Sequence, residues 1–170
     1  MTTQLLSPKQ YLYSSLDELG QDRILGRCID AILNNGHVAI GIWGEKGIGK
    51  SSLERTLAKK IYGSFEVARE FRITRRDEIP ALVKKVRTDQ RFWIPHRGTY
   101  LKRIWCLDWD DIAVDLPSST GNRKEFIKFH RWFQTIRTHV AVLLGSFVEW
   151  GDFKKRAKVG FTGEIACFWT

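Results

Sequence analysis

The sequence predicts an α/β fold, a three-layer sandwich in which helices cover both faces of a mostly parallel β-sheet. Two observations predict it: segments with helical spacing of apolar residues alternate with short strands along the 170 residues, and those strands are apolar almost throughout. Strands buried on both faces have this composition, and alternation of strand and helix favours parallel pairing. The length fits one domain, so we expect residues 1–170 to form a single unit with right-handed crossovers.

The first 90 residues contain three segments in which apolar residues recur every three or four positions. This spacing is typical of helices, and turn residues near the ends of the segments are typical of helix termini. The expected helices are residues 15–36, 50–64 and 77–90. The expected strands of this half are residues 37–44 and 67–74, and residues 1–15 are expected to form an extended lead-in.

The second half of the chain continues the alternation. Residues 91–101 are expected to be irregular, followed by a strand at 103–111 that ends in acidic residues. A loop at 115–122 then precedes a helix at 123–139 and a continuous apolar strand at 140–146. The remaining segments are a basic stretch at 151–158 and a strand or hairpin at 159–169.

Charge and cysteine content narrow the classes of function. The 28 lysines and arginines outnumber the 19 acidic residues, which gives a net charge of +9. This excess favours contact with a polyanion such as nucleic acid, although solubility alone would also account for it. Cys28, Cys106 and Cys167 are scattered and have neither disulfide-framework nor zinc-site spacing, so we expect them in the core.

Membrane and targeting signals are not evident in the sequence. No apolar run reaches the roughly 18 residues of a membrane span. The N-terminal segment MTTQLLSPKQYLYSS lacks the basic start and apolar stretch of a signal peptide. We therefore expect a cytoplasmic protein without a membrane partner.

A glycine-rich loop between the first strand and the following helix is the most specific motif. Gly44, Gly49, Lys50 and Ser51 occupy the fixed positions of the pattern GxxxxGK[ST], a coincidence expected in about one chain in a few hundred of this length. In this pattern main-chain N–H groups and a helix N-terminus surround a triphosphate, the lysine reaches the β and γ phosphates, and the hydroxyl holds Mg²⁺. The alternative is an ordinary glycine-rich turn.

Acidic residues end the strand at 103–111. Four apolar residues precede Asp108, which we expect to hold Mg²⁺, and Asp110 and Asp111 are candidates to orient the attacking water. The alternative is that these acids cap a loop or pair with the basic surface. Ser146, at the end of the next apolar strand, is a candidate to contact the γ-phosphate or the water, but a turn role is also open.

Two basic segments raise further possibilities. Arg156 is a candidate arginine finger toward the nucleotide of another subunit, against the alternative of a solvated basic loop. Residues 91–103 mix aromatic and basic side chains, so they are suited either to lie along a single nucleic-acid strand or to anchor a long loop in the core.

The order of these segments resembles the core of an AAA+ or STAND-type ATPase, and the loop GIWGEKGIGKSSL resembles the P-loop of the NB-ARC branch. The resemblance implies a five-stranded sandwich, ATP with Mg²⁺, and assembly into rings or with partners. Leu19, Gly20 and Gln21 match the segment that borders the adenine. The residues expected to contact the nucleotide are Gly44, Glu45, Lys46, Gly47, Ile48, Gly49, Lys50, Ser51, Ser52, Gly20 and Gln21. The expected catalytic residues are Lys50, Asp108, Asp110, Asp111 and Ser146.

Two departures from that family bear on activity. Trp109 stands where the family usually carries a catalytic glutamate, and no segment corresponding to the helical lid follows the last strand. Three expectations follow: a homo-oligomer or another protein partner supplies the role of the lid or the arginine finger, turnover is slow, or the protein is a minimal stand-alone variant. Three functions remain open: an ATPase coupled to nucleic acid or a protein partner in replication, partition or a mobile element, a small-molecule or nucleotide kinase, and a nucleotide-dependent switch with negligible turnover.

Overall fold

A computed structural model of the chain describes residues 7–112, 123–148 and 161–167. Its centre is a five-stranded sheet in the order β2-β5-β6-β1-β7, and all neighbouring strands pair in parallel. The strands are β1 (Val38–Trp43), β2 (Arg72–Ile73), β5 (Ile104–Trp109), β6 (Val140–Phe147) and β7 (Gly163–Ala166). The expected α/β fold with a parallel sheet is therefore confirmed.

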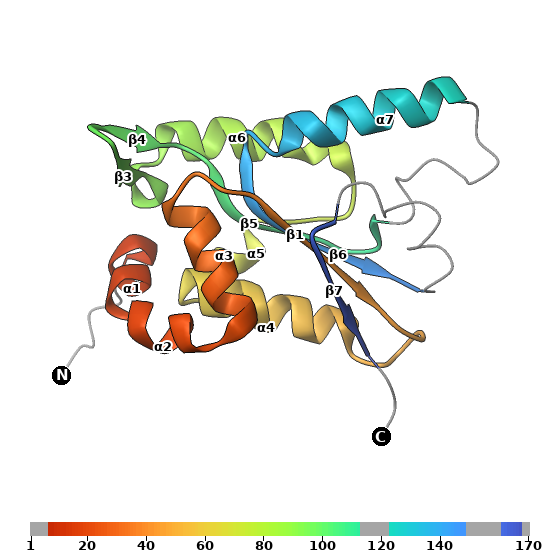
Figure 1. Cartoon of the computed structure of the whole chain (residues 1–170), viewed down its shortest axis with the longest axis horizontal. Coiled ribbons are helices and arrows are strands. Elements are labelled where there is room, and N and C mark those ends of the chain that lie inside the picture. The colour runs from red at the N-terminus through yellow and green to blue at the C-terminus, as the bar shows by residue number, and fades with distance from the viewer. Residues whose placement is uncertain (1–6, 113–122, 149–160, 168–170) are drawn as a thin grey trace.

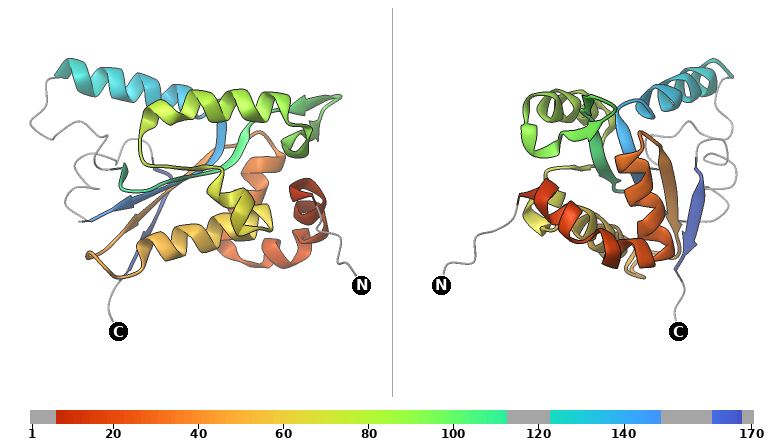
Figure 2. Two further views of the ribbon diagram at one scale, coloured as in Figure 1. Left: turned by 180° about the vertical axis from the view of Figure 1, so that it is seen from behind. Right: turned by 60° about the vertical axis from the view of Figure 1, so that its left-hand side comes forward.

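Helices flank this sheet on both faces (Figure 1). Two of them, α6 (Ile79–Thr88) and α7 (Arg123–Ile136), lie on one side, and α3 (Arg23–Leu33) and α4 (Lys50–Tyr62) lie on the other (Figure 2). The helix α4 packs against β1, β5 and β6, the three central strands. Because the three central strands β1, β5 and β6 are buried almost throughout, this arrangement explains their continuous apolar composition.

The register of the central strands brings three chain segments to one edge of the sheet. Trp43 at the end of β1 lies opposite Phe147 of β6, and Trp109 at the end of β5 lies opposite Gly145. The carboxyl ends of parallel strands meet at the same edge, where open α/β sheets bind ligands. The loop after β1, the acids after β5 and the end of β6 therefore lie side by side.

A cluster of aromatic side chains fixes the position of α4 on the sheet. Tyr62 stacks between Phe71 and Trp105, with ring centroids 4.9 and 5.8 Å away. The Tyr62 hydroxyl donates to the carbonyl of Cys106 at 2.9 Å and accepts from its N–H at 3.0 Å. Because all these groups are buried, the last turn of α4 is tied to the middle of β5.

The N-terminal part corrects two predictions. Residues 8–14, expected to be extended, form α1 (Pro8–Ser14), because Ser7 and Gln10 form a reciprocal capping box and Pro8 occupies the first turn. The single helix expected over 15–36 is two helices, α2 (Leu16–Gln21) and α3, since Asp22 leaves the helical conformation. Its carboxylate caps α3 by accepting from two main-chain N–H groups.

The structure of the segment between α4 and β5 corrects two more predictions. Residues 67–74, expected to be a strand, are partly α5 (Phe65–Arg69), which Ser64 caps, and only Arg72 and Ile73 pair with β5. Residues 91–101, expected to be irregular, form a hairpin of β3 (Ile94–His96) and β4 (Thr99–Leu101) after a short 3₁₀ turn. Arg97 and Gly98 both have positive φ, as a two-residue type I′ turn requires.

The other expected elements agree with the structure. These are the helices α4, α6 and α7 and the strands β1, β5 and β6. Of the two options for residues 159–169, a strand is found, because β7 pairs in parallel with β1. The predicted loop at 115–122 and basic stretch at 151–158 lie outside the described residues. None of the described helices is long and apolar enough to span a membrane.

Candidate functional site

The loop between β1 and α4 has a backbone that requires glycine. Gly47 and Gly49 have φ values of 87° and 94°, which side chains other than glycine rarely adopt. A Cβ atom at either position would meet nothing within 4 Å, so the space above the loop is open. At Gly44 the reason is different, since a Cβ there would lie 2.5 Å from the carbonyl oxygen of Cys167.

The same loop presents unpaired donors around that open space. In the described part of the chain no acceptor is recorded for the main-chain N–H groups of Gly47, Gly49, Lys50 and Ser51. Gly49 occupies the cap position of α4 and has no side chain to satisfy the first turn. Free N–H groups at a helix N-terminus attract anions. Among the described residues, these donors therefore have the arrangement that suits an anion.

The ammonium group of Lys50 folds back over this loop. Its Nζ donates to the carbonyl oxygens of Gly44 and Glu45, both at 2.7 Å. An ammonium has three donors, so one remains for another acceptor. Lys46 is exposed at the tip of the loop, and Ser52 is exposed on the first turn of α4. Lys50 is thus the cation that the fold holds beside the free N–H groups.

Alternation along β5 separates the acids from the tryptophan between them. Asp108 and Asp110 lie two residues apart and face the α4 side of the sheet, where Asp110 reaches Ser51. Trp109 faces the other side, is wholly buried, and packs edge-to-face on Trp132 of α7 at 5.5 Å. The residue at position 109 is therefore part of the core beneath α7.

Asp110 is the centre of the polar contacts at this edge. The Ser51 hydroxyl donates to Oδ1 of Asp110 at 3.1 Å, and the Ser146 hydroxyl lies 3.5 Å from the same oxygen. Arg72 of β2 forms an ion pair with Asp110, and its Nε lies 3.8 Å from Oδ2 of Asp108. The structure thus brings together the predicted residues Ser51, Asp108, Asp110 and Ser146.

Asp111 takes part in this edge through its backbone. Its φ of 53° is in the left-handed region, which turns the chain sharply after β5. In that conformation its main-chain N–H donates to the Ser146 hydroxyl at 2.9 Å. The exposed side chain of Asp111 has no partner recorded among the described residues. Its contribution here is therefore to orient Ser146.

Two carboxyl groups are buried beneath the loop. Asp108 is 2% exposed, and burial raises its pKa to about 6, against the opposing effect of Arg72. Glu54 of α4 is wholly buried, and burial together with repulsion from Asp108 and Asp110 raises its pKa to about 9. Oδ1 of Asp108 and both oxygens of Glu54 have no well-formed hydrogen bond, although Ser146 lies close enough to Glu54 to lower its pKa slightly. At neutral pH Glu54 is therefore protonated.

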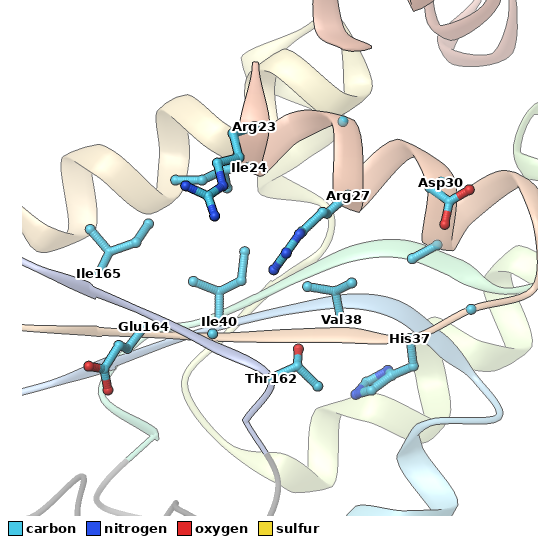
Figure 3. Close-up of a pocket in the computed structure, with 14 residues that line it drawn as sticks. Arg23, Ile24, Arg27, Asp30, His37, Val38, Ile40, Thr162, Glu164 and Ile165 are labelled. Atoms are coloured by element: carbon cyan, nitrogen blue, oxygen red, sulfur yellow. The ribbon is translucent and has the colours of Figure 1, made fainter. Parts of the chain in front are cut away.

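The segment expected to border the adenine lies one turn away from a pocket. Gly20 and Gln21 end α2 and are exposed, and Gly20 packs on Gly26 of α3, where a Cβ would lie 3.0 Å from the Gly20 oxygen. Gly26 in turn lines a pocket of about 550 Å³ between α3, β1 and β7. Arg23 and Arg27 point from α3 toward its apolar floor (Figure 3). That floor contains Val38, Ile40 and Ile165.

Two residues of this edge, Glu54 and Arg72, were not predicted from the sequence. Glu54 shares the buried stripe of α4 with Leu57, Ala58 and Ile61, so a carboxyl group at this helical spacing was a usable signal. Arg72 gives no comparable signal, because its role depends on pairing between β2 and β5. Arg156, the candidate arginine finger, lies outside the described residues.

Comparison with known proteins does not assign the chain to a family. No protein-family model matches the chain, and no curated protein matches it significantly. Within the described residues, no group of three or more His, Cys, Asp or Glu side chains has the arrangement of a metal site. Magnesium sites built from one or two carboxylates and substrate phosphates need no such group, so the donors present fit that ion.

Proposed function

We propose that this chain is a P-loop protein of AAA+-like type that binds ATP with Mg²⁺ at the loop Gly44–Ser52 and hydrolyses it. The observation that carries the proposal is the open glycine loop whose unpaired N–H groups stand beside Lys50. A polyphosphate offers the anionic oxygens that these donors lack. The position of the loop, after the central strand β1 and before α4, agrees with the context that the motif requires.

The polar edge opposite the loop fits the metal ion. Ser51 and Asp110 already share a hydrogen bond of 3.1 Å, so their oxygens are close enough to bind one cation together, with the hydroxyl keeping its proton and offering a lone pair. Bound there, Mg²⁺ neutralises charge on the phosphates. Asp108 was the carboxylate expected in this role, and its buried, unpartnered Oδ1 is a second acceptor behind Asp110. We infer that Asp110 contacts the ion and that Asp108 supports it.

Hydrolysis also needs a group that orients water. Ser146 lies within 3.5 Å of Asp110 and accepts the N–H of Asp111, so its hydroxyl is held at the edge of the sheet between β5 and β1. A positioned hydroxyl of this kind can orient a water molecule toward the γ-phosphate. We assign this role to Ser146. The buried Trp109 offers no carboxylate, which favours slow turnover.

The pocket beside α3 is suited to the nucleoside. It lies on the same side of the sheet as α4, and Ile165 on its floor pairs with Ile42, two residues before Gly44. An apolar floor with polar groups at its margin is typical of small-molecule sites. We therefore place the adenine in this pocket, with Gly20 and Gln21 behind α3 rather than against the base.

Nucleotide binding is tested by calorimetric titration of the protein with ATP and Mg²⁺. Lys50→Ala removes a charged donor at the phosphates and is expected to weaken binding by at least about tenfold. Lys84→Ala is the control, since this exposed lysine belongs to α6, on the face of the sheet opposite α4, and the variant should bind ATP like wild type. Equal affinity of Lys50→Ala and wild type would remove the basis of the proposal.

Phosphate release separates this function from its two alternatives. Release without any added acceptor supports an ATPase, whereas consumption of ATP only with an acceptor indicates a kinase. Tight binding with no release indicates a nucleotide-dependent switch, which the buried Trp109 also favours. Measuring release with and without single- and double-stranded DNA tests whether the net charge of +9 serves a nucleic-acid partner.

A further inference from the structure

A second pocket adjoins the proposed site on the side away from β1. It has a volume of about 630 Å³ and lies between α4, α5 and the end of β2. Arginine side chains from three different elements line it, namely Arg55, Arg69 and Arg72. Asp108 also lines it, so the pocket and the proposed metal edge share a wall. No residue of the glycine loop lines this pocket.

The charges of this pocket are not balanced within the described chain. Arg72 pairs with Asp110 and Asp108, but Arg55 and Arg69 are exposed and have no recorded ion pair with any described residue. Glu78, the second acid that lines the pocket beside Asp108, already accepts the main-chain N–H groups of Thr74 and Arg75. Two guanidinium groups are therefore available to an anion. Guanidinium groups bind phosphate through paired hydrogen bonds.

The remaining wall is apolar and includes an exposed ring. Ala58 and Ala68 are buried at its base, and Phe65 is 44% exposed at its rim. The ammonium of Lys59 lies 4.6 Å from the centre of the Phe65 ring, which adds positive charge and helps to hold the ring. A ligand with an organic part would remove this ring from water. The pocket thus offers a cationic side and an apolar side.

We propose that this pocket binds a small organic phosphate monoester, with its phosphate on Arg55 and Arg69 and its organic part against Phe65. A phosphate in this position also lies within the reach of Arg72, and so competes with Asp110 for that guanidinium. Binding in the pocket stands independently of the nucleotide site. Its consequence for Asp110, in contrast, rests on the proposed function.

That consequence has a definite sign. When the ligand draws Arg72 away, Asp110 loses its ion pair, and the guanidinium no longer offsets the negative charge of this carboxylate beside Ser51. A carboxylate without a neighbouring cation attracts Mg²⁺ more strongly. The monoester therefore tightens binding of Mg²⁺ with ATP, and by linkage the nucleotide tightens binding of the monoester by the same factor.

Phenyl phosphate is a suitable probe, and calorimetry without nucleotide measures its binding. Arg55→Gln and Arg69→Gln are each expected to weaken binding roughly tenfold, because each removes a charged donor. Lys50→Ala tests whether the probe occupies the glycine loop instead, and Arg131→Gln, an exposed arginine of α7, controls for net charge. Both of these variants should bind phenyl phosphate as tightly as wild type does. Unchanged binding by the two pocket variants, or loss in Lys50→Ala, would overturn the assignment.

Inorganic phosphate in the same titration separates the two sources of the anion. Tighter binding of phenyl phosphate supports an organic monoester, whereas equal affinity shows that Phe65 contributes nothing and refutes that part of the proposal. The coupling is measured by titrating ATP and Mg²⁺ with saturating phenyl phosphate, where affinity should rise at least about fivefold. Failure of ATP to bind, with phenyl phosphate still bound at the arginines, would refute the proposed function and leave the pocket assignment intact.

Discussion

Glu54 gives a prediction that depends on structure alone. Its carboxyl group is wholly buried beneath the glycine loop, and neither oxygen has a well-formed hydrogen bond. Burial and the neighbouring Asp108 and Asp110 raise its pKa to about 9, from 4.5 for an ordinary glutamate. The folded protein therefore keeps a proton that the unfolded chain releases. Glu54→Gln preserves the shape of the side chain and removes this proton.

The sign and size of the effect follow from linkage. Because the folded pKa is raised, the stabilising contribution is complete below pH 4.5 and is lost as the pH rises toward about 9. In that window the free energy of unfolding falls by about 1.4 kcal/mol per pH unit for one proton. From pH 7 to pH 8.5 the loss is about 2 kcal/mol. Asp108 acts in the same direction, but its pKa of about 6 places its effect below this range.

Urea denaturation of wild type and Glu54→Gln at both pH values, without nucleotide or Mg²⁺, measures the difference. Wild type should lose about 2 kcal/mol more than the variant, whose curve should be nearly flat over this range. Comparison of slopes, rather than of absolute stabilities, cancels any packing change that glutamine introduces. Equal slopes for the two proteins would show that Glu54 is ionised in the fold, and would refute the account of this buried cluster.

Three further pairs of substitutions test the loop, the aromatic cluster around Tyr62 and the metal ligand. Gly49→Ala and Gly98→Ala both place a side chain at positive φ, and each should lower the free energy of unfolding by about 1 to 2 kcal/mol in urea denaturation. Only Gly49→Ala should also weaken ATP binding; equally weakened ATP binding in Gly98→Ala would contradict the role of the loop. Tyr62→Phe leaves two buried groups of Cys106 without their partner and should cost about 1 to 3 kcal/mol in the same assay, against almost nothing for the exposed Tyr13→Phe. Asp110→Asn should raise the Mg²⁺ concentration needed for ATP binding more than Asp108→Asn does, and the reverse order would reassign the metal ligand.

Local signals accounted for the central elements of the fold. The apolar strands around Ile40, Leu107 and Val142 and the helical spacing in α4 need only neighbouring residues to be recognised. The errors arose where short-range hydrogen bonds override apolar pattern. Ser7 caps a helix in a segment that was expected to be extended, and Ser64 caps a helix where a strand was expected. Asp22 caps α3 and so divides a segment that was expected to be one continuous helix.

The candidate site likewise has one part that the sequence predicts and one part that it does not. The glycine loop is contiguous, so its residue types show its chemistry directly. The acidic edge is assembled from β2, β5, β6 and α4, and the sequence could not show that Ser51 lies against Asp110 or that Arg72 pairs with both acids. Those contacts depend on strand order, which only the folded sheet determines.

The main-chain amides of the loop test the central claim most directly. In nitrogen–proton correlation spectra, addition of ATP and Mg²⁺ should produce the largest shifts at Gly47, Gly49, Lys50 and Ser51, whose N–H groups have no acceptor recorded in the described chain. Lys50→Ala should suppress these shifts at the same nucleotide concentration. If these four amides stay in place while the nucleotide binds elsewhere, or if no resonance moves, the loop is an ordinary turn and the proposed function is wrong.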